Sequence, residues 1–265
     1  MRKGPVERTA DNTTSDAVHD YNMATANVDE ANAHAAHTRN RRLAAGTSRA
    51  EAFSDGVFAI VITLLVLDLH PPKAPPGQLL SGLIQQWPAY FAYVTSYLYV
   101  GVVWLNHRAA FRRVQDCDKG LHWANLGVLF TSALLPFPTA ILAQAMQNRN
   151  TTDTRTAVGV YALVGTFLCL SWWVFFHYLS RRPELVHDDV DEWFFAAERN
   201  RAFAGIMLYA AAGVLGYLVA PVIALVIFLV VPTFYGITSE GLFERPIAAT
   251  LLSPRAVRSH KKNGK

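Results

Sequence analysis

The fold is decided by the first apolar segment of the chain, residues 49–69, which read RAEAFSDGVFAIVITLLVLDL. A helix needs about 20 mainly apolar residues to cross a hydrocarbon core about 30 Å thick, and this segment has that length and that composition. Ser48 and Glu51 have the spacing of a capping box, and His70 precedes two prolines. These flanking residues predict a helix that begins and ends with the segment.

Five further apolar segments follow, at residues 88–107, 121–146, 156–179, 202–218 and 220–238. Gly216 and Pro221 mark a turn between the last two segments, which together are too long for a single span. Pro136 and Pro138 lack backbone N–H groups, so the helix that contains them is expected to kink or break. The sequence therefore predicts an all-α membrane protein with six transmembrane helices.

The polar residues collect outside these segments. Of the 265 residues 52% are hydrophobic and only 17% are charged, which excludes an intrinsically disordered chain. Residues 1–48 contain no apolar run and are expected to be a disordered cytoplasmic tail, residues 49–240 the six-helix transmembrane domain, and residues 241–265 a basic cytoplasmic tail. The two cysteines have no metal-binding spacing, so neither a disulfide nor a metal site is predicted.

The basic residues are distributed unevenly across the predicted spans. Of the 24 Lys and Arg residues, all except Lys73, Arg149 and Arg155 fall on one side. Loops rich in Lys and Arg stay in the cytoplasm, so both termini are predicted to be cytoplasmic. A soluble helical protein has no reason to segregate its basic residues in this way.

The first predicted helix has one apolar face that carries a single hydroxyl group. At about 100° per residue, the side chains within about 60° of Ile60 are those of Phe53, Gly56, Thr63, Leu64 and Leu67. Asp55 falls about 140° from Ile60, and Ser54 falls about 120° away on the other flank. By itself, an aliphatic face of this kind most often contacts lipid or packs in a core.

Asp55 needs a partner because an ionisable group in a membrane span usually faces the protein interior. We expect it to meet a cation or a hydrogen-bond donor from another helix. The candidates at the same depth are Arg49, Asn106, His107 and Arg108.

The segment from Arg49 to Leu67, with its Arg-x-x-x-Phe-Ser-Asp core, resembles the first-helix signature of the bacterial branch of the transmembrane protein 175 family, the lysosomal potassium channel family. Weaker matches follow in order at residues 104–108 (WLNHR), at residues 134–139 (LLPFPT) and in the terminal helical hairpin. The single copy of the motif is similar to the six-span bacterial subunit rather than to the doubled animal form.

The resemblance implies a homotetramer in a bacterial inner membrane, with a central pore lined by the first helix of each subunit. It implies a potassium-permeable cation channel, and no cofactor is expected. Because no predicted span is rich in Arg, the conductance is predicted to be leak-like, and a hydrophobic pore is predicted to prefer potassium over sodium only modestly. The hydrophobic constriction of this pore would be formed by Ile60, Leu64 and Leu67, with Thr63 as the selectivity layer. A structural motif and polar network would comprise Arg49, Phe53, Ser54, Asp55, Trp104, Asn106 and His107.

The physics of such a pore differs from that of ordinary potassium channels. The sequence contains no Thr-Val-Gly-Tyr-Gly filter, so backbone carbonyls are not expected to replace the hydration shell of the ion. An aliphatic ring gates by dewetting, and an ion passes when the ring widens enough for the ion to keep some of its water. The resemblance therefore implies a hydrophobic gate.

A proton- or cation-coupled secondary transporter is the main alternative, because titratable residues lie in or near the predicted spans. They are Asp55, Asp68, His70, His107, His122 and His177. Transporters of this kind are commonly built from internal repeats, and the chain has no second Phe-Ser-Asp motif. No GxSxG or HExxH motif occurs either, so no enzymatic activity is predicted. The basic tail is expected to contact anionic lipid rather than nucleic acid.

Overall fold

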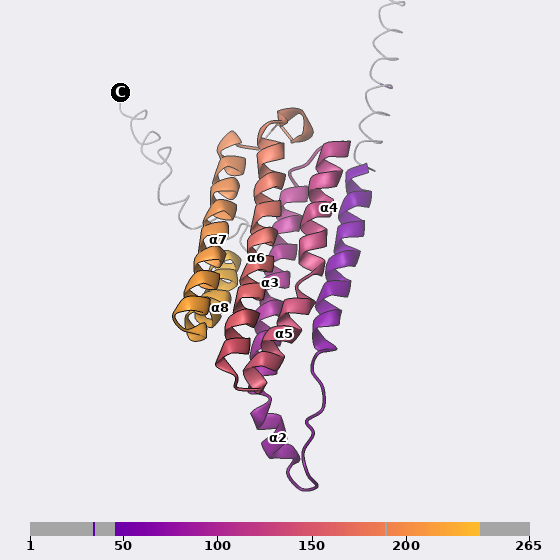
Figure 1. Ribbon diagram of the computed structural model, residues 1–265. Helices are drawn as coiled ribbons and strands as arrows, with labels where there is room; N and C mark the ends of the chain where they lie inside the picture. Colours follow the sequence, from indigo (N-terminus) through magenta and orange to yellow (C-terminus); the bar gives the residue numbers. More distant parts are fainter. Residues whose placement is uncertain (1–33, 35–45, 189, 239–265) are drawn as a thin grey trace, which may run out of the picture. The chain divides into compact units, whose positions relative to one another are not determined.

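The computed structural model describes residue 34 and residues 46–188 and 190–238, and the regular structure within them is helical apart from one isolated bridge between Val114 and Val186 (Figure 1). The described residues from Thr47 onward belong to one compact unit. The predicted tail at residues 241–265 and nearly all of the predicted tail at residues 1–48 lie outside the described residues.

Helices occupy each of the six predicted segments. The first helix covers residues 46–66. The helices that follow are α2 (Leu79–Gln85), α3 (Trp87–Phe111), α4 (Lys119–Ala133), α5 (Pro136–Gln147), α6 (Thr151–Ser180), α7 (Glu192–Leu218) and α8 (Pro221–Thr238), with a short 3₁₀ turn at Pro183–Leu185. The sequence reasoning missed α2, a seven-residue helix in the connection between the first helix and α3.

Both predicted ends of the first helix need correction. Residues 46–48 are already helical, so Ser48 lies inside the helix and the predicted capping box is wrong. At the other end the helix stops at residue 66, before Leu69. The N–H of Leu67 bonds to the carbonyl of Leu64, three residues back, and this tighter turn closes the helix ahead of the prolines.

The predicted break at the two prolines is confirmed. The third apolar segment is divided into α4, which ends at Ala133, and α5, which begins at Pro136. The N–H of Leu135 bonds to the carbonyl of Ser132, which tightens the turn between the two helices. Pro136 stands at the first position of α5, where its missing N–H would have had no helical partner.

Helix α6 lies at the centre of the bundle and contacts α4, α5, α7 and α8. Tyr161, Leu168 and Phe175 are among its fully buried side chains. The approach of α7 to α6 depends on small residues, because a Cβ atom added at Gly165 would lie 2.6 Å from the ring of Tyr209. Such a contact is far too short for real atoms, so glycine is required at this position.

By length and composition, three stretches in the described part of the chain could each cross a bilayer. They are Lys119–Gln147, Thr151–Ser180 and Trp193–Leu218. Half of the most apolar window is buried in the first two, but only 28% in the third, so α7 turns most of its apolar surface outward. Helix α8 is strongly apolar but shorter.

Candidate functional site

The first helix has one face that nothing else in the described unit covers. Ile60 is 59% exposed and Leu67 is 66% exposed, although both are large aliphatic residues. The exposed positions along this face are Phe53, Gly56, Ile60, Thr63, Leu64 and Leu67. Steps of three and four residues place these side chains on one face of the helix. These are the same residues that the helical periodicity of the sequence places within about 60° of Ile60.

The opposite face of the first helix is packed into the bundle. Phe58, Val61 and Leu65 are at most 1% exposed, and all three belong to the main core. Ser54 lies on this buried side and is fully enclosed. The two faces therefore differ in environment and not merely in composition.

A buried asparagine on α4 joins the first helix to α3. The side-chain amide of Asn125 donates to the hydroxyl of Ser54 over 2.9 Å, and its carbonyl oxygen lies 2.8 Å from Nε2 of His107. Ser54 in turn donates to the carbonyl of Ala50. Figure 1 shows the first helix beside α4, which supplies this asparagine.

The hydrogen bonds determine which nitrogen of His107 carries the proton. Because the oxygen of Asn125 can only accept, Nε2 of the imidazole must be the donor. The other nitrogen, Nδ1, is buried without a hydrogen-bond partner among the described residues. Phe111 stacks on the imidazole at 4.4 Å, and Phe58 meets it edge-on. His107 is thus enclosed by aromatic rings and held in one tautomer.

A second polar contact joins the first helix to α3. The indole N–H of Trp104 donates to a carboxylate oxygen of Asp55 over 2.8 Å. The guanidinium carbon of Arg108 lies 5.2 Å from the centre of the Trp104 ring. The expectation of a donor from another helix is therefore confirmed, but the donor is Trp104 and not one of the four candidates at the same depth.

The remaining residues of the predicted network lie apart from these contacts. Arg49 and Phe53 are exposed on the first helix. Asn106 is half-buried and lines a separate cavity of about 60 Å³ with Trp172 and Arg201. Asn125, which bonds to both Ser54 and His107 and so forms the buried anchor between the first helix and α3, was not predicted. The signal that could have revealed it is a polar residue in the middle of an apolar span, where it needs partners.

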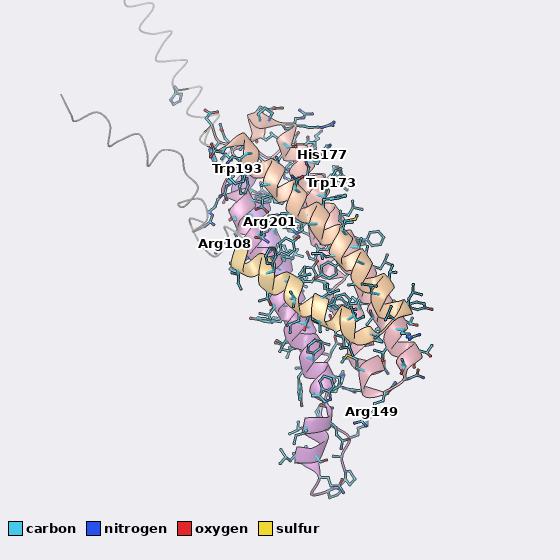
Figure 2. The ribbon with its side chains drawn as sticks, turned by 90° about the vertical axis from the view of Figure 1, so that its left-hand side faces the viewer. Arg108, Arg149, Trp173, His177, Trp193 and Arg201 are labelled. Atoms are coloured by element: carbon cyan, nitrogen blue, oxygen red, sulfur yellow. The ribbon has the colours of Figure 1, made fainter. Side chains whose placement is uncertain are left out.

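The titratable residues that could serve a transporter do not gather at one place. His70 and His122 each bond to a backbone carbonyl of their own neighbourhood, at Asp68 and Asp118. His177 stacks on Trp173 with the ring centres 4.9 Å apart (Figure 2). Within the described residues no group of three His, Cys, Asp or Glu side chains is arranged to hold a metal ion.

In the loop before α4, outside the spans, the pKa values of two side chains are shifted from their ordinary values. Burial, with help from the charges of Asp118 and Asp116, raises the pKa of the Cys117 thiol to about 11, so this cysteine stays protonated. Partial burial acts to raise the pKa of the Asp118 carboxyl, but hydrogen bonds from Tyr178 and from the N–H of Leu121 outweigh it and lower that pKa. Asp118 is accordingly an ionised N-cap of α4.

The sequence of this chain is similar to those of known channel proteins. Residues 49–136 match the family described as "Endosomal/lysosomal potassium channel TMEM175". A protein named as a potassium channel of Streptomyces collinus is 38% identical over 204 residues, which cover 77% of this chain and 98% of that protein. The human endosomal/lysosomal proton channel TMEM175 is 30% identical over 180 residues, which cover only 35% of its length.

A solved structure agrees with these matches. The crystal structure of a lysosomal potassium-selective channel TMEM175 homolog from Chamaesiphon minutus superposes with a TM-score of 0.61 and 30% identity, over 72% of this chain and 96% of that chain. The fold is therefore that of an all-helical membrane protein of the channel class. The chain belongs to the TMEM175 family.

The buried anchor yields a test of stability. Asn125→Ala leaves the Nε2–H of His107 buried without an acceptor, and this is expected to cost about 1–3 kcal/mol. The midpoint of thermal unfolding in detergent should fall by several degrees. Asn106→Ala is the matched control because Asn106 takes no part in the anchor. Equal midpoints for the two variants would contradict this role of Asn125.

Proposed function

We propose that this protein is a potassium-permeable, leak-like cation channel in which four copies surround a pore lined by their first helices. The observation that carries the proposal is the exposed apolar face of that helix, which a single chain leaves without a partner. The names of the relatives support potassium as the permeant ion. Potassium is the transported species, and no cofactor is required.

Ile60, Leu64 and Leu67 would form the constriction of this pore. They occupy neighbouring turns of the exposed face, so four symmetric copies would repeat each side chain as a ring around the axis. Rings of aliphatic side chains exclude water from a narrow pore, and conduction then requires the ring to widen. The pore is proposed to gate by dewetting and to select modestly for potassium over sodium.

Thr63 would supply the polar layer between these rings. Its hydroxyl donates to the carbonyl of Ile60 over 2.8 Å, so its proton is directed to the helix backbone. A hydroxyl that donates inward still has lone pairs that can accept, and these are available on the exposed side of the helix. Four such oxygens around one axis would face a partly dehydrated cation.

The chain is proposed to span a bacterial inner membrane six times, with both termini in the cytoplasm. The distribution of Lys and Arg supports this orientation. Trp193 is exposed at one end of the bundle, where Trp173 and His177 also lie, and Arg149 lies at the other end (Figure 2). Tryptophan is enriched where a membrane protein meets the headgroup layer.

The constriction can be tested by enlarging it. Ile60→Ala and Leu67→Ala should each raise potassium flux into liposomes severalfold, because a smaller side chain leaves a wider and wetter pore. Val66→Ala is the matched control, since Val66 is also exposed but lies off the face of Ile60. The measurement is valinomycin-independent potassium flux, with unitary currents recorded in planar bilayers.

Two outcomes would contradict the channel. One is an intact tetramer that carries no valinomycin-independent potassium flux. The other is saturable flux that is coupled to a second ion and shows no unitary current steps, which would favour a secondary transporter.

The selectivity layer has its own test. Thr63→Val keeps the shape of the side chain but removes its oxygen, so preference for potassium should fall while current persists. Reversal potentials in mixed potassium and sodium should move towards zero, whereas Thr63→Ser should retain most of the wild-type value. An unchanged reversal potential in Thr63→Val would exclude this role for the hydroxyl.

The contact between Asp55 and Trp104 is expected to support assembly. Asp55→Ala removes the acceptor for the indole N–H and weakens the contact between the first helix and α3, so the tetramer fraction in native mass spectrometry should fall severalfold. The remaining tetramers should keep the wild-type reversal potential. Asp153→Ala changes an exposed acid on α6 and is the control. Altered selectivity with normal assembly would place Asp55 in the ion path instead.

A further inference from the structure

An open apolar groove runs between α6 and α7 on the outer surface of the bundle, with a volume of about 500 Å³. Its lining includes Gly159, Leu163 and Thr166 from α6 and Gly213, Val214 and Tyr217 from α7. The groove therefore lies between two helices that are each long and apolar enough to cross a bilayer.

Small residues create the groove. A Cβ atom added at Gly213 would lie 2.7 Å from the Cβ of Ala162, so the floor of the groove is a close contact between the two helices. A Cβ atom added at Gly159 would meet nothing within 4 Å, so there is open space above the floor. Leu163 and Val214 are each more than half exposed and form walls on either side.

A cation lies beyond one end of the groove. Arg155 precedes Gly159 by four residues, one helical turn or about 6 Å along the axis. One guanidinium nitrogen of Arg155 donates to the carbonyl of Val219 over 3.2 Å, at the C-terminal end of α7. The Nε atom is buried and has no hydrogen-bond partner among the described residues, so an anion at the surface would be met by the terminal guanidinium nitrogens, one of which also bonds to Val219.

Two residues near Arg155 bear on whether an anion could bind at this end of the groove. Asp153 is an exposed acid, but residues two apart on a helix do not face each other. Tyr217 lines the same end of the groove and is 52% exposed. Tyrosine is enriched at the boundary between hydrocarbon and headgroups. Along the surface, the apolar groove is thus followed by the amphipathic ring of Tyr217 and then by the cation of Arg155.

We propose that an anionic phospholipid occupies this groove, with one acyl chain between α6 and α7 and its phosphate on Arg155. A ligand with a long apolar tail and a single anionic head matches both the apolar lining and the cation one turn beyond it. Arginine binds phosphate through its planar set of donors. The site is independent of the pore face, because it uses none of the first-helix residues.

Lipid retention on the purified oligomer tests the site. Protein is incubated with equal amounts of phosphatidylglycerol and phosphatidylcholine, and the bound lipids are counted by native mass spectrometry. Wild-type protein should prefer phosphatidylglycerol. Arg155→Gln should reduce that preference about tenfold, the loss that corresponds to one hydrogen bond to a charged group. Arg149→Gln is the control, since Arg149 is an exposed cation at the same end of the bundle but precedes α6, whereas Arg155 lies on α6 one turn from Gly159.

Filling the groove tests the acyl chain separately. Gly159→Leu should reduce retention of both lipids, and Leu163→Trp provides a second filling variant in case the first fails to fold. Unchanged retention in Arg155→Gln and in both filling variants would overturn the proposal. If a folded filling variant lost its oligomeric state and kept its lipids, a second copy of the chain would be the occupant instead.

Discussion

The bond pair made by Asn125 is the interaction on which the arrangement of the first helix depends. Its amide reaches Ser54 on one side and His107 on the other, so three helices meet through one buried side chain. A buried polar group without partners is costly, and this requirement allows only one rotation of the first helix about its axis. That rotation leaves Ile60 and Leu67 exposed on the opposite side.

The contact between Trp104 and Asp55 reinforces the same rotation from the flank of the helix. The aliphatic residues could not fix it alone, because apolar contacts are not directional and a helix that is apolar on both sides could turn without losing much buried area. Polar contacts on one side of the first helix and exposed aliphatic residues on the other therefore belong together in this fold. The anchors provide orientation, and the proposed pore uses it.

Helix α6 organises the other half of the bundle in a different way. Gly165 allows α7 to approach until the ring of Tyr209 lies over its backbone, so small residues rather than polar bonds determine that contact. The same close approach leaves a groove on the outside, where Gly159 carries no side chain to fill it. The contact between α6 and α7 is thus specified mainly by steric fit, whereas the position of the first helix is specified by hydrogen bonds.

Sequence reasoning predicted the helical segments, the break before Pro136 and the membership of the exposed face, because length, missing N–H groups and a period of 3.6 residues are local properties. It did not predict α2, the true ends of the first helix, the role of Asn125 or the choice of Trp104 as the donor to Asp55. The roles of Asn125 and Trp104 depend on which side chains meet across helices that are distant along the chain. The sequence by itself determined that Asp55 and Ser54 must turn away from Ile60. Only the tertiary structure decided which side chains form hydrogen bonds with Asp55 and Ser54, because a hydrogen bond requires its two groups to lie within about 3 Å of each other and in line.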